Sequence, residues 1–204
     1  MGWLALAARD MTLSADRVLP SVVQLEACEN YQKQSYRNRC YILAGDGPQM
    51  LQVPVVHGAD MAITQVKVDY STPWVLRTER ALDTAYETAA YYEYYRDSLF
   101  PLLEEKKENL WELNLSLIRW CLEKTGIACT LVPTEDFAAP DSLPDDYRYA
   151  VHPKRPDRAL PHLGLDKPYY QVFRDRRGGF TPKLSCLDLL FNEGPDSILW
   201  LKSL

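Results

Sequence analysis

Two arginines in the first quarter of the chain have the spacing of an anion-binding pair. In the segment YQKQSYRNRC, Arg37 and Arg39 are one residue apart. In an extended strand they would share one face at about 7 Å from each other. Two guanidinium groups placed in this way can bind a phosphate or a carboxylate bidentately. A solvated edge strand, whose charges discourage pairing with another sheet, explains the same residues, and the sequence leaves both interpretations open.

Polar side chains at apolar positions form a second set of candidates. Asn114 lies on the apolar stripe of an expected helix. A buried amide must be hydrogen-bonded or it costs about 1–3 kcal/mol, so Asn114 either ties two backbone segments together or points into a ligand cavity. Gln171, Asn192 and Glu193 also stand out, because the local structure expected around them does not require these residue types.

Two residues are candidates for proton transfer. His152 precedes a proline among basic residues, and the simpler alternative is a surface histidine in a loop. Asp188 lies three residues after Ser185, a spacing that also predicts a helix cap. The three histidines share no helical spacing and the five cysteines form no CxxC pair, so we predict neither a metal site nor a cofactor.

Composition narrows the class of protein. The net charge of −5 over 204 residues argues against binding nucleic acid through general electrostatics. The first ten residues lack the features of a signal peptide, and no apolar run approaches the roughly 20 residues that span a bilayer. Scattered cysteines are typical of small core-filling thiols in a reducing compartment. We therefore expect a cytoplasmic protein.

Hydrophobic periodicity and turn chemistry predict the elements that position these residues. Alternating or apolar runs predict strands, and the sequence AGDGP at residues 44–48 predicts a hairpin turn, because glycine takes positive φ at little cost. Apolar residues at three- and four-residue steps predict helices, the clearest of which ends at Gly126. The expected strands are residues 22–25, 41–43, 49–56, 63–70 and 127–132, and the expected helices are residues 3–8, 82–103 and 110–122.

The last third of the chain combines an irregular segment with a capped helical unit. Residues 133–168 contain seven prolines and predict a long surface loop, of the kind that is often functional. Residues 168–195 then predict an aromatic strand, a basic glycine turn, and a helix that ends at Gly194 before a second helix. The expected fold is mixed α/β. It is one domain over residues 1–204, with a mixed sheet, a central helical block, this loop and a C-terminal strand–helix–helix unit.

Several blocks of the sequence, in order, resemble the WbqC-like protein family. The blocks are ENYQKQSYRNRC, LQVPV, VKVDYSTPW, WELNLSLI, YYQVF and LSCLDLLFNEGP, and the resemblance runs from about Glu29 to Leu201. It implies a place in bacterial surface-polysaccharide (O-antigen) biosynthesis. The family's members look like transferases, and the reaction that the resemblance implies is acyl or aminoacyl transfer to an amino sugar.

The resemblance also marks positions in this chain. It implies that Arg37 and Arg39 hold an anionic group, such as the diphosphate of a nucleotide sugar, and that His152 or Asp188 handles protons. The expected small-molecule partner is a nucleotide sugar or an acyl donor. The expected substrate-binding residues are Gln32, Arg37, Asn38, Arg39, Asn114, Gln171, Asn192 and Glu193, and the motif also includes Trp74 and Tyr86.

Three departures from the family pattern favour other functions. Family members usually begin with a strand and a proline-containing turn, whereas this chain starts at about the helix that follows, so we expect part of a ligand site to be missing or the start to be truncated. Cys28 and Thr78 stand where the family often has histidines. A non-catalytic module that binds a sugar nucleotide is therefore one alternative. An interaction scaffold is another, in which the tyrosine-rich residues 91–95 form the face of a homo-oligomer.

Overall fold

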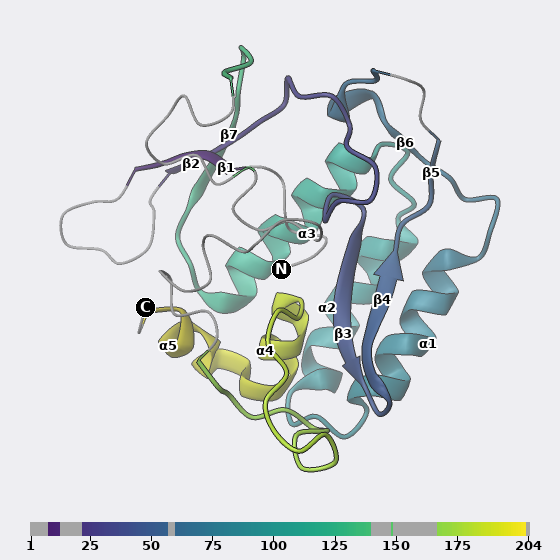
Figure 1. Cartoon of the computed structure of the whole chain (residues 1–204), viewed down its shortest axis with the longest axis vertical. Helices are drawn as coiled ribbons and strands as arrows, with labels where there is room; N and C mark the ends of the chain where they lie inside the picture. The colour runs from purple at the N-terminus through teal and green to yellow at the C-terminus, as the bar shows by residue number, and fades with distance from the viewer. Residues whose placement is uncertain (1–7, 13–21, 57–59, 140–147, 149–166, 203–204) are drawn as a thin grey trace.

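A layer of helices with small sheets beside it forms the fold (Figure 1). The computed structural model describes residues 8–12, 22–56, 60–139, 148 and 167–202. The hairpin of β3 and β4 lies along α1, and β3 also contacts α4. The larger helices are α1 (Trp74–Tyr86), α2 (Tyr92–Glu104), α3 (Leu110–Thr125) and α4 (Cys186–Glu193), and the hairpin strands are β3 (Arg39–Ala44) and β4 (Gly47–Gln52). The mixed α/β class predicted from the sequence is confirmed.

The strands of the described residues form three small sheets. β2 (Val22–Leu25) pairs antiparallel with β1 (Ala8–Thr12) and parallel with β7 (Thr130–Pro133), so this sheet is mixed. β3 and β4 are antiparallel, and the pair Ala44 and Gly47 closes a two-residue turn of Gly45 and Asp46. β5 (Val55–Val56) pairs antiparallel with β6 (Lys67–Val68). The hairpin and the strand at residues 22–25 are therefore confirmed.

The boundaries of α3 follow from its capping residues. The side chain of Asn109 accepts a hydrogen bond from the backbone N–H of Trp111 at 2.7 Å, which satisfies one of the free donors of the first turn. Gly126 ends the helix with a φ of +68°, the left-handed conformation that glycine adopts without a steric penalty. In α2, by contrast, the helix continues through Pro101 to Glu104.

Two predicted strands are divided in the structure. The strand expected over residues 49–56 stops at Gln52, because Pro54 cannot donate to a ladder and Val55 and Val56 pair with β6 instead. The strand expected over residues 63–70 opens with a 3-10 helix, η1 (Ile63–Gln65), and only Lys67 and Val68 form β6. The predicted alternation of burial holds at the centre of this segment, where Val66 and Val68 are buried and Gln65 and Lys67 are exposed.

The aromatic strand expected before α4 is wrong. Residues 167–171 are irregular and residues 172–178 form turns. The side chain of Gln171 forms the two hydrogen bonds that a neighbouring strand would form with Thr181. It donates to the carbonyl of Thr181 at 2.9 Å and accepts from the N–H of Thr181 at 2.8 Å. The remainder of the unit is as predicted: Ser185 caps α4, and a 3-10 helix, η2 (Gly194–Asp196), leads into α5 (Ser197–Lys202). The helix expected at residues 3–8 lies outside the described residues except for Ala8, which opens β1.

An aromatic cluster in the core joins three helices. The ring of Phe191 on α4 lies 5.0 Å from the rings of both Tyr86 on α1 and Tyr92 on α2, measured between centroids. Tyr95 is buried as well, so of the four tyrosines in the segment proposed as an oligomer face, residues 91–95, only Tyr91 and Tyr94 are exposed. The role of that face remains a prediction.

Within the described part of the chain, no helix has both the length and the apolar composition needed to cross a membrane.

Candidate functional site

Asp188 is a buried carboxylate with three side-chain donors. The hydroxyl of Tyr86 donates to Oδ1 at 2.6 Å, and the hydroxyl of Tyr169 and Nε2 of Gln171 donate to Oδ2 at 2.7 and 2.9 Å. The hydroxyl of Tyr86 in turn accepts from the N–H of Leu43 at 3.1 Å. Burial raises the pKa of Asp188, and the three hydrogen bonds act against this rise. The side chain is thus part of a core network, not of the capping box that its spacing from Ser185 suggested.

Two other predicted residues lie around the same helix. The amide nitrogen of Asn192 donates to the carbonyl of Asp188 at 2.7 Å, one turn back along α4. Oε1 of Glu193 accepts from the N–H of Tyr170 at 2.7 Å. The structure therefore brings Gln171, Asp188, Asn192 and Glu193 together and holds the segment before α4 against it.

Arg37 belongs to a different cluster. Its Nε and Nη2 atoms donate to the two carboxylate oxygens of Glu29, both at 2.5 Å, and both side chains are 4% exposed. Arg37 precedes β3, so the two arginines do not share a strand face as expected. Arg39 opens β3, is half-buried, and donates through Nε to the carbonyl of Ser35 at 3.1 Å. The guanidinium donors of Arg37 are engaged within the protein.

Buried amides surround this ion pair. Nδ2 of Asn114 on α3 donates to the carbonyl of Arg37 at 2.8 Å, and Nδ2 of Asn38 donates to the carbonyl of Val53 at 2.9 Å. The Oδ1 atoms of both asparagines are buried without a hydrogen-bond partner. Gln32 is half-buried, and its backbone carbonyl accepts from the hydroxyl of Ser35 at 2.7 Å. Asn114 thus ties two segments together, the first of the two roles considered for it.

The predicted site residues therefore divide into two sets, one around Arg37 and one around Asp188. No hydrogen bond between described residues joins a side chain of one set to a side chain of the other. His152 lies outside the described residues. The binding and catalytic roles assigned to these residues remain predictions.

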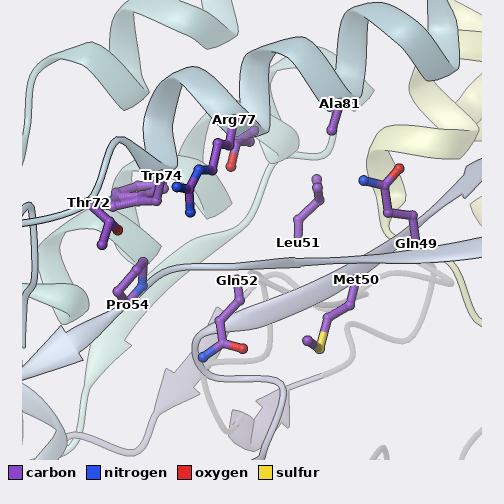
Figure 2. A pocket seen from close by; sticks show the side chains of 10 residues that line it. Gln49, Met50, Leu51, Gln52, Pro54, Thr72, Trp74, Arg77 and Ala81 are labelled. Atoms are coloured by element: carbon purple, nitrogen blue, oxygen red, sulfur yellow. The ribbon is translucent and has the colours of Figure 1, made fainter.

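An open pocket of about 240 Å³ lies elsewhere, between β4 and the first half of α1. Figure 2 shows Arg77 reaching from α1 toward β4, with Leu51 on the strand directed back toward the helix. Met50 and Gln52 point to the opposite side of the strand, as alternation requires. The residues that line the pocket are Gln49, Met50, Leu51, Gln52, Pro54, Thr72, Trp74, Arg77, Thr78 and Ala81.

The lining of the pocket suits a polar anionic ligand. Trp74 is 3% exposed, and its indole N–H is buried without a hydrogen-bond acceptor in the described structure. Arg77 is exposed and is the single charged residue of the lining. The lining residues include no carboxylate, histidine or cysteine, so the pocket offers hydrogen-bond donors and apolar surface without an evident acid–base group.

Two residues of this pocket, Trp74 and Thr78, are also motif positions of the sequence. Trp74 is a motif position in the segment VKVDYSTPW, and Thr78 stands where the family often has a histidine. Arg77, Gln49 and Gln52 were not singled out, because isolated polar residues on a helix and a strand carry no local signal. The available indications were the tryptophan directly after the proline that precedes α1 and the threonine one turn further along the helix.

Comparison with known proteins gives consistent results. Residues 21–149, well over half of the chain, match the WbqC-like protein family. The chain is also 30% identical over 194 residues to the uncharacterized protein Rv1507c of Mycobacterium tuberculosis, with 84% of each protein covered. No solved structure matches the chain significantly. The matched segment includes the pocket and the cluster around Arg37, while α4 follows it.

Proposed function

This chain belongs to the WbqC-like protein family, and from that premise we propose that it binds a nucleotide sugar of bacterial surface-polysaccharide biosynthesis in the pocket between α1 and β4. The observation that carries the proposal is the exposed guanidinium of Arg77, the single charged group of a pocket whose other lining residues are polar or apolar. A phosphate can accept from this guanidinium, and a sugar ring can contact the side chain of Trp74, which lines the same pocket.

The size of the pocket limits how much of the ligand it holds. Sites that enclose drug-sized ligands have volumes of roughly 300–1,000 Å³, and this pocket has about 240 Å³. The sugar ring and the adjacent phosphate fit such a volume, with the nucleoside extending through the open side. The threonine hydroxyls of Thr72 and Thr78 and the amide of Gln49 supply further hydrogen-bonding groups for a hydroxyl-rich ring.

Binding without catalysis is the function that this lining supports best. A transferase needs a group that accepts or donates a proton within hydrogen-bond reach of the reacting atom. The pocket lining has no carboxylate or histidine, and Thr78 occupies a position where the family often has a histidine. A threonine hydroxyl at that position can orient a ligand but is a poor acid–base group at neutral pH.

The test is thermal denaturation in the presence of nucleotide sugars. A ligand at 100 times its dissociation constant stabilises the folded state by about 2.7 kcal/mol. We expect a panel of uridine, guanosine and thymidine diphosphate sugars to include at least one that raises the Tm of the wild-type protein. Arg77→Met should abolish most of the shift, because it removes the charge while keeping a long side chain in the pocket.

Arg80→Met is the matched control. Arg80 is an exposed arginine of the same helix that does not line the pocket, so its variant should keep the full shift. If no nucleotide sugar raises the Tm, the binding proposal is wrong. If Arg77→Met and Arg80→Met respond alike, the protein binds the ligand elsewhere than in this pocket.

Acyl or aminoacyl transfer to an amino sugar is the second candidate, and Asp188 favours it. A buried carboxyl group with a raised pKa beside two tyrosine hydroxyls is a common setting for an acid–base residue. Incubation with a nucleotide amino sugar and an acyl or aminoacyl donor, followed by mass spectrometry, would detect the acylated sugar. A product that forms with wild-type protein and not with Asp188→Asn would establish transfer, and absence of product would leave binding as the function.

A further inference from the structure

Two cysteines that are distant in sequence meet where α3 packs against α4. Sγ of Cys121 on α3 lies 3.1 Å from Sγ of Cys186 at the first position of α4. Both cysteines are free thiols, and 65 residues separate them in the chain. A disulfide has its sulfurs about 2.05 Å apart, so a movement of about 1 Å would bring these two sulfurs to bonding distance. The other cysteine of this region, Cys40 on β3, is fully buried.

The two sulfurs differ in how readily they ionise. The hydrogen bond between the two thiols lowers the pKa of Cys186, and Ser185 and the backbone at the start of α4 contribute in the same direction, while burial acts against them. Burial raises the pKa of Cys121, and the neighbouring sulfur of Cys186 raises it further. Burial also raises the pKa of Cys40 to about 12. Because the thiolate is the reactive form, these directions favour Cys186 as the nucleophile of the pair and Cys121 as its partner.

From the approach of these sulfurs between two packed helices, we infer that Cys121 and Cys186 form a redox-active pair that a hydroperoxide converts reversibly to a disulfide. Cys186 is half-buried as a residue while Cys121 is 8% exposed, so Cys186 is the nearer of the two to the surface. Disulfides of this kind in reducing compartments are transient and serve redox sensing or catalysis. The inference is independent of the proposed sugar-nucleotide site.

The chemistry has two steps. The Cys186 thiolate attacks one oxygen of the hydroperoxide, the O–O bond breaks, and the products are a Cys186 sulfenic acid and hydroxide or alkoxide, which takes up a proton. The thiol of Cys121 then loses its proton and attacks the sulfur of the sulfenic acid. An S–S bond forms, the S–O bond breaks, and water leaves. Two thiols are thus oxidised by two electrons while one peroxide is reduced.

The disulfide would act directly on the candidate network around Asp188. Cys186 opens α4, and Asp188 follows in the first turn of the same helix. A covalent bond to α3 would fix the start of α4, and with it the carboxylate that Tyr86, Tyr169 and Gln171 contact. Oxidation would therefore rigidify α4, whose residues Asp188 and Glu193 hydrogen-bond residues 169–171.

Peptide mapping of the full-length protein tests the inference, because trypsin places each of the five cysteines on a different peptide. Reduced wild-type protein is exposed to hydrogen peroxide, remaining thiols are blocked with iodoacetamide, and the digest is analysed without reductant. We expect a cross-linked species of residues 120–124 and residues 184–202, two hydrogens lighter than the sum of the two peptides. Dithiothreitol should convert it back to the separate peptides.

Variants distinguish a specific pair from general oxidation. Cys129→Ser removes another half-buried cysteine that belongs to a different region, and it should leave the yield of the cross-link unchanged. Cys186→Ser should abolish the cross-link and leave Cys121 as an alkylated thiol. The inference is overturned if the wild-type protein gives no such species, or if Cys186 is found joined to Cys40 as often as to Cys121.

Discussion

Arg37 is a buried arginine whose charge is paired with a buried carboxylate. Its guanidinium forms two hydrogen bonds with Glu29, and both side chains are 4% exposed. Desolvation of two charges costs several kcal/mol per ion, and the pair recovers this cost only through close and well-directed contacts. The carbonyl of Arg37 also accepts from Asn114. This residue therefore connects the segment before β3 to α3.

The buried pair predicts a non-additive pattern of stability. Arg37→Met should lower the free energy of unfolding by about 3–5 kcal/mol, because it leaves the carboxylate of Glu29 buried without a partner. The double variant Glu29→Gln with Arg37→Met should cost clearly less than the sum of the two single variants. Urea denaturation gives these free energies. Additive costs in this cycle would mean that the two side chains do not interact in the folded protein.

At the scale of elements, the C-terminal end of α4 packs closely against the residue that precedes α2. Gly194 follows α4 with a φ of +57°, and a Cβ atom placed there would lie 2.5 Å from the ring of Tyr91. The N–H of Tyr91 donates to the carbonyl of Phe191 at 3.0 Å. Glycine at this position thus allows both the turn out of α4 and the close approach of the tyrosine ring.

This contact predicts different costs for two glycine substitutions. Gly126→Ala places a side chain at a φ of +68° with no atom within 4 Å, and it should cost about 1–2 kcal/mol. Gly194→Ala should cost about 1–3 kcal/mol more, because it adds the overlap with Tyr91 and because Gly194, with a φ of +57° and a ψ of −131°, lies outside the left-handed helical region that Gly126 occupies. Thermal or urea unfolding of the two variants provides the comparison. Equal costs would contradict the prediction that the conformation of Gly194 and its contact with Tyr91 both require glycine.

Local signals predicted some of these elements and not others. α3 was predicted well, because its apolar stripe and Gly126 lie within one short segment. The strand expected before α4 was wrong. The aromatic run there has the composition of a strand, but its backbone pairs with no strand of the described residues, and the side chain of Gln171 hydrogen-bonds the backbone of Thr181. Periodicity describes which side of a segment is buried but not what pairs with it.

At the scale of the whole molecule, single side chains hydrogen-bond segments that are far apart in the chain. The hydroxyl of Tyr86 lies between β3 and α4, since it accepts from Leu43 and donates to Asp188. Asn109 caps α3 and donates to the carbonyl of Thr64 in η1 at 2.6 Å. Such connections couple the hairpin, the helices and η1 energetically.

This coupling predicts a single cooperative unfolding transition for residues 1–204. Far-ultraviolet circular dichroism follows the helices, and tryptophan fluorescence follows the packing around Trp74, Trp111 and Trp120, which are all buried. The two signals should give the same midpoint of urea denaturation. Two separated midpoints would contradict the prediction that the chain is one domain.

The sequence by itself determined the mixed α/β class, the hairpin, the capped helix α3 and the family. These follow from residue types within short segments, where backbone conformation and the choice of buried face are decided locally. Tertiary structure alone decided which polar side chains meet. The hydroxyl of Tyr86 reaches Asp188 across 102 residues, and the thiol of Cys121 reaches Cys186 across 65.

The candidate pocket shows the same division. Trp74 was identified by its motif, but its pairing with Arg77 and with the side chains of β4 depends on how α1 packs against the hairpin. The free energy of a buried polar group depends on the partner that folding brings to it. For that reason the sequence identified residues worth examining, and the packing of distant segments decided which of them are engaged within the core and which line a pocket.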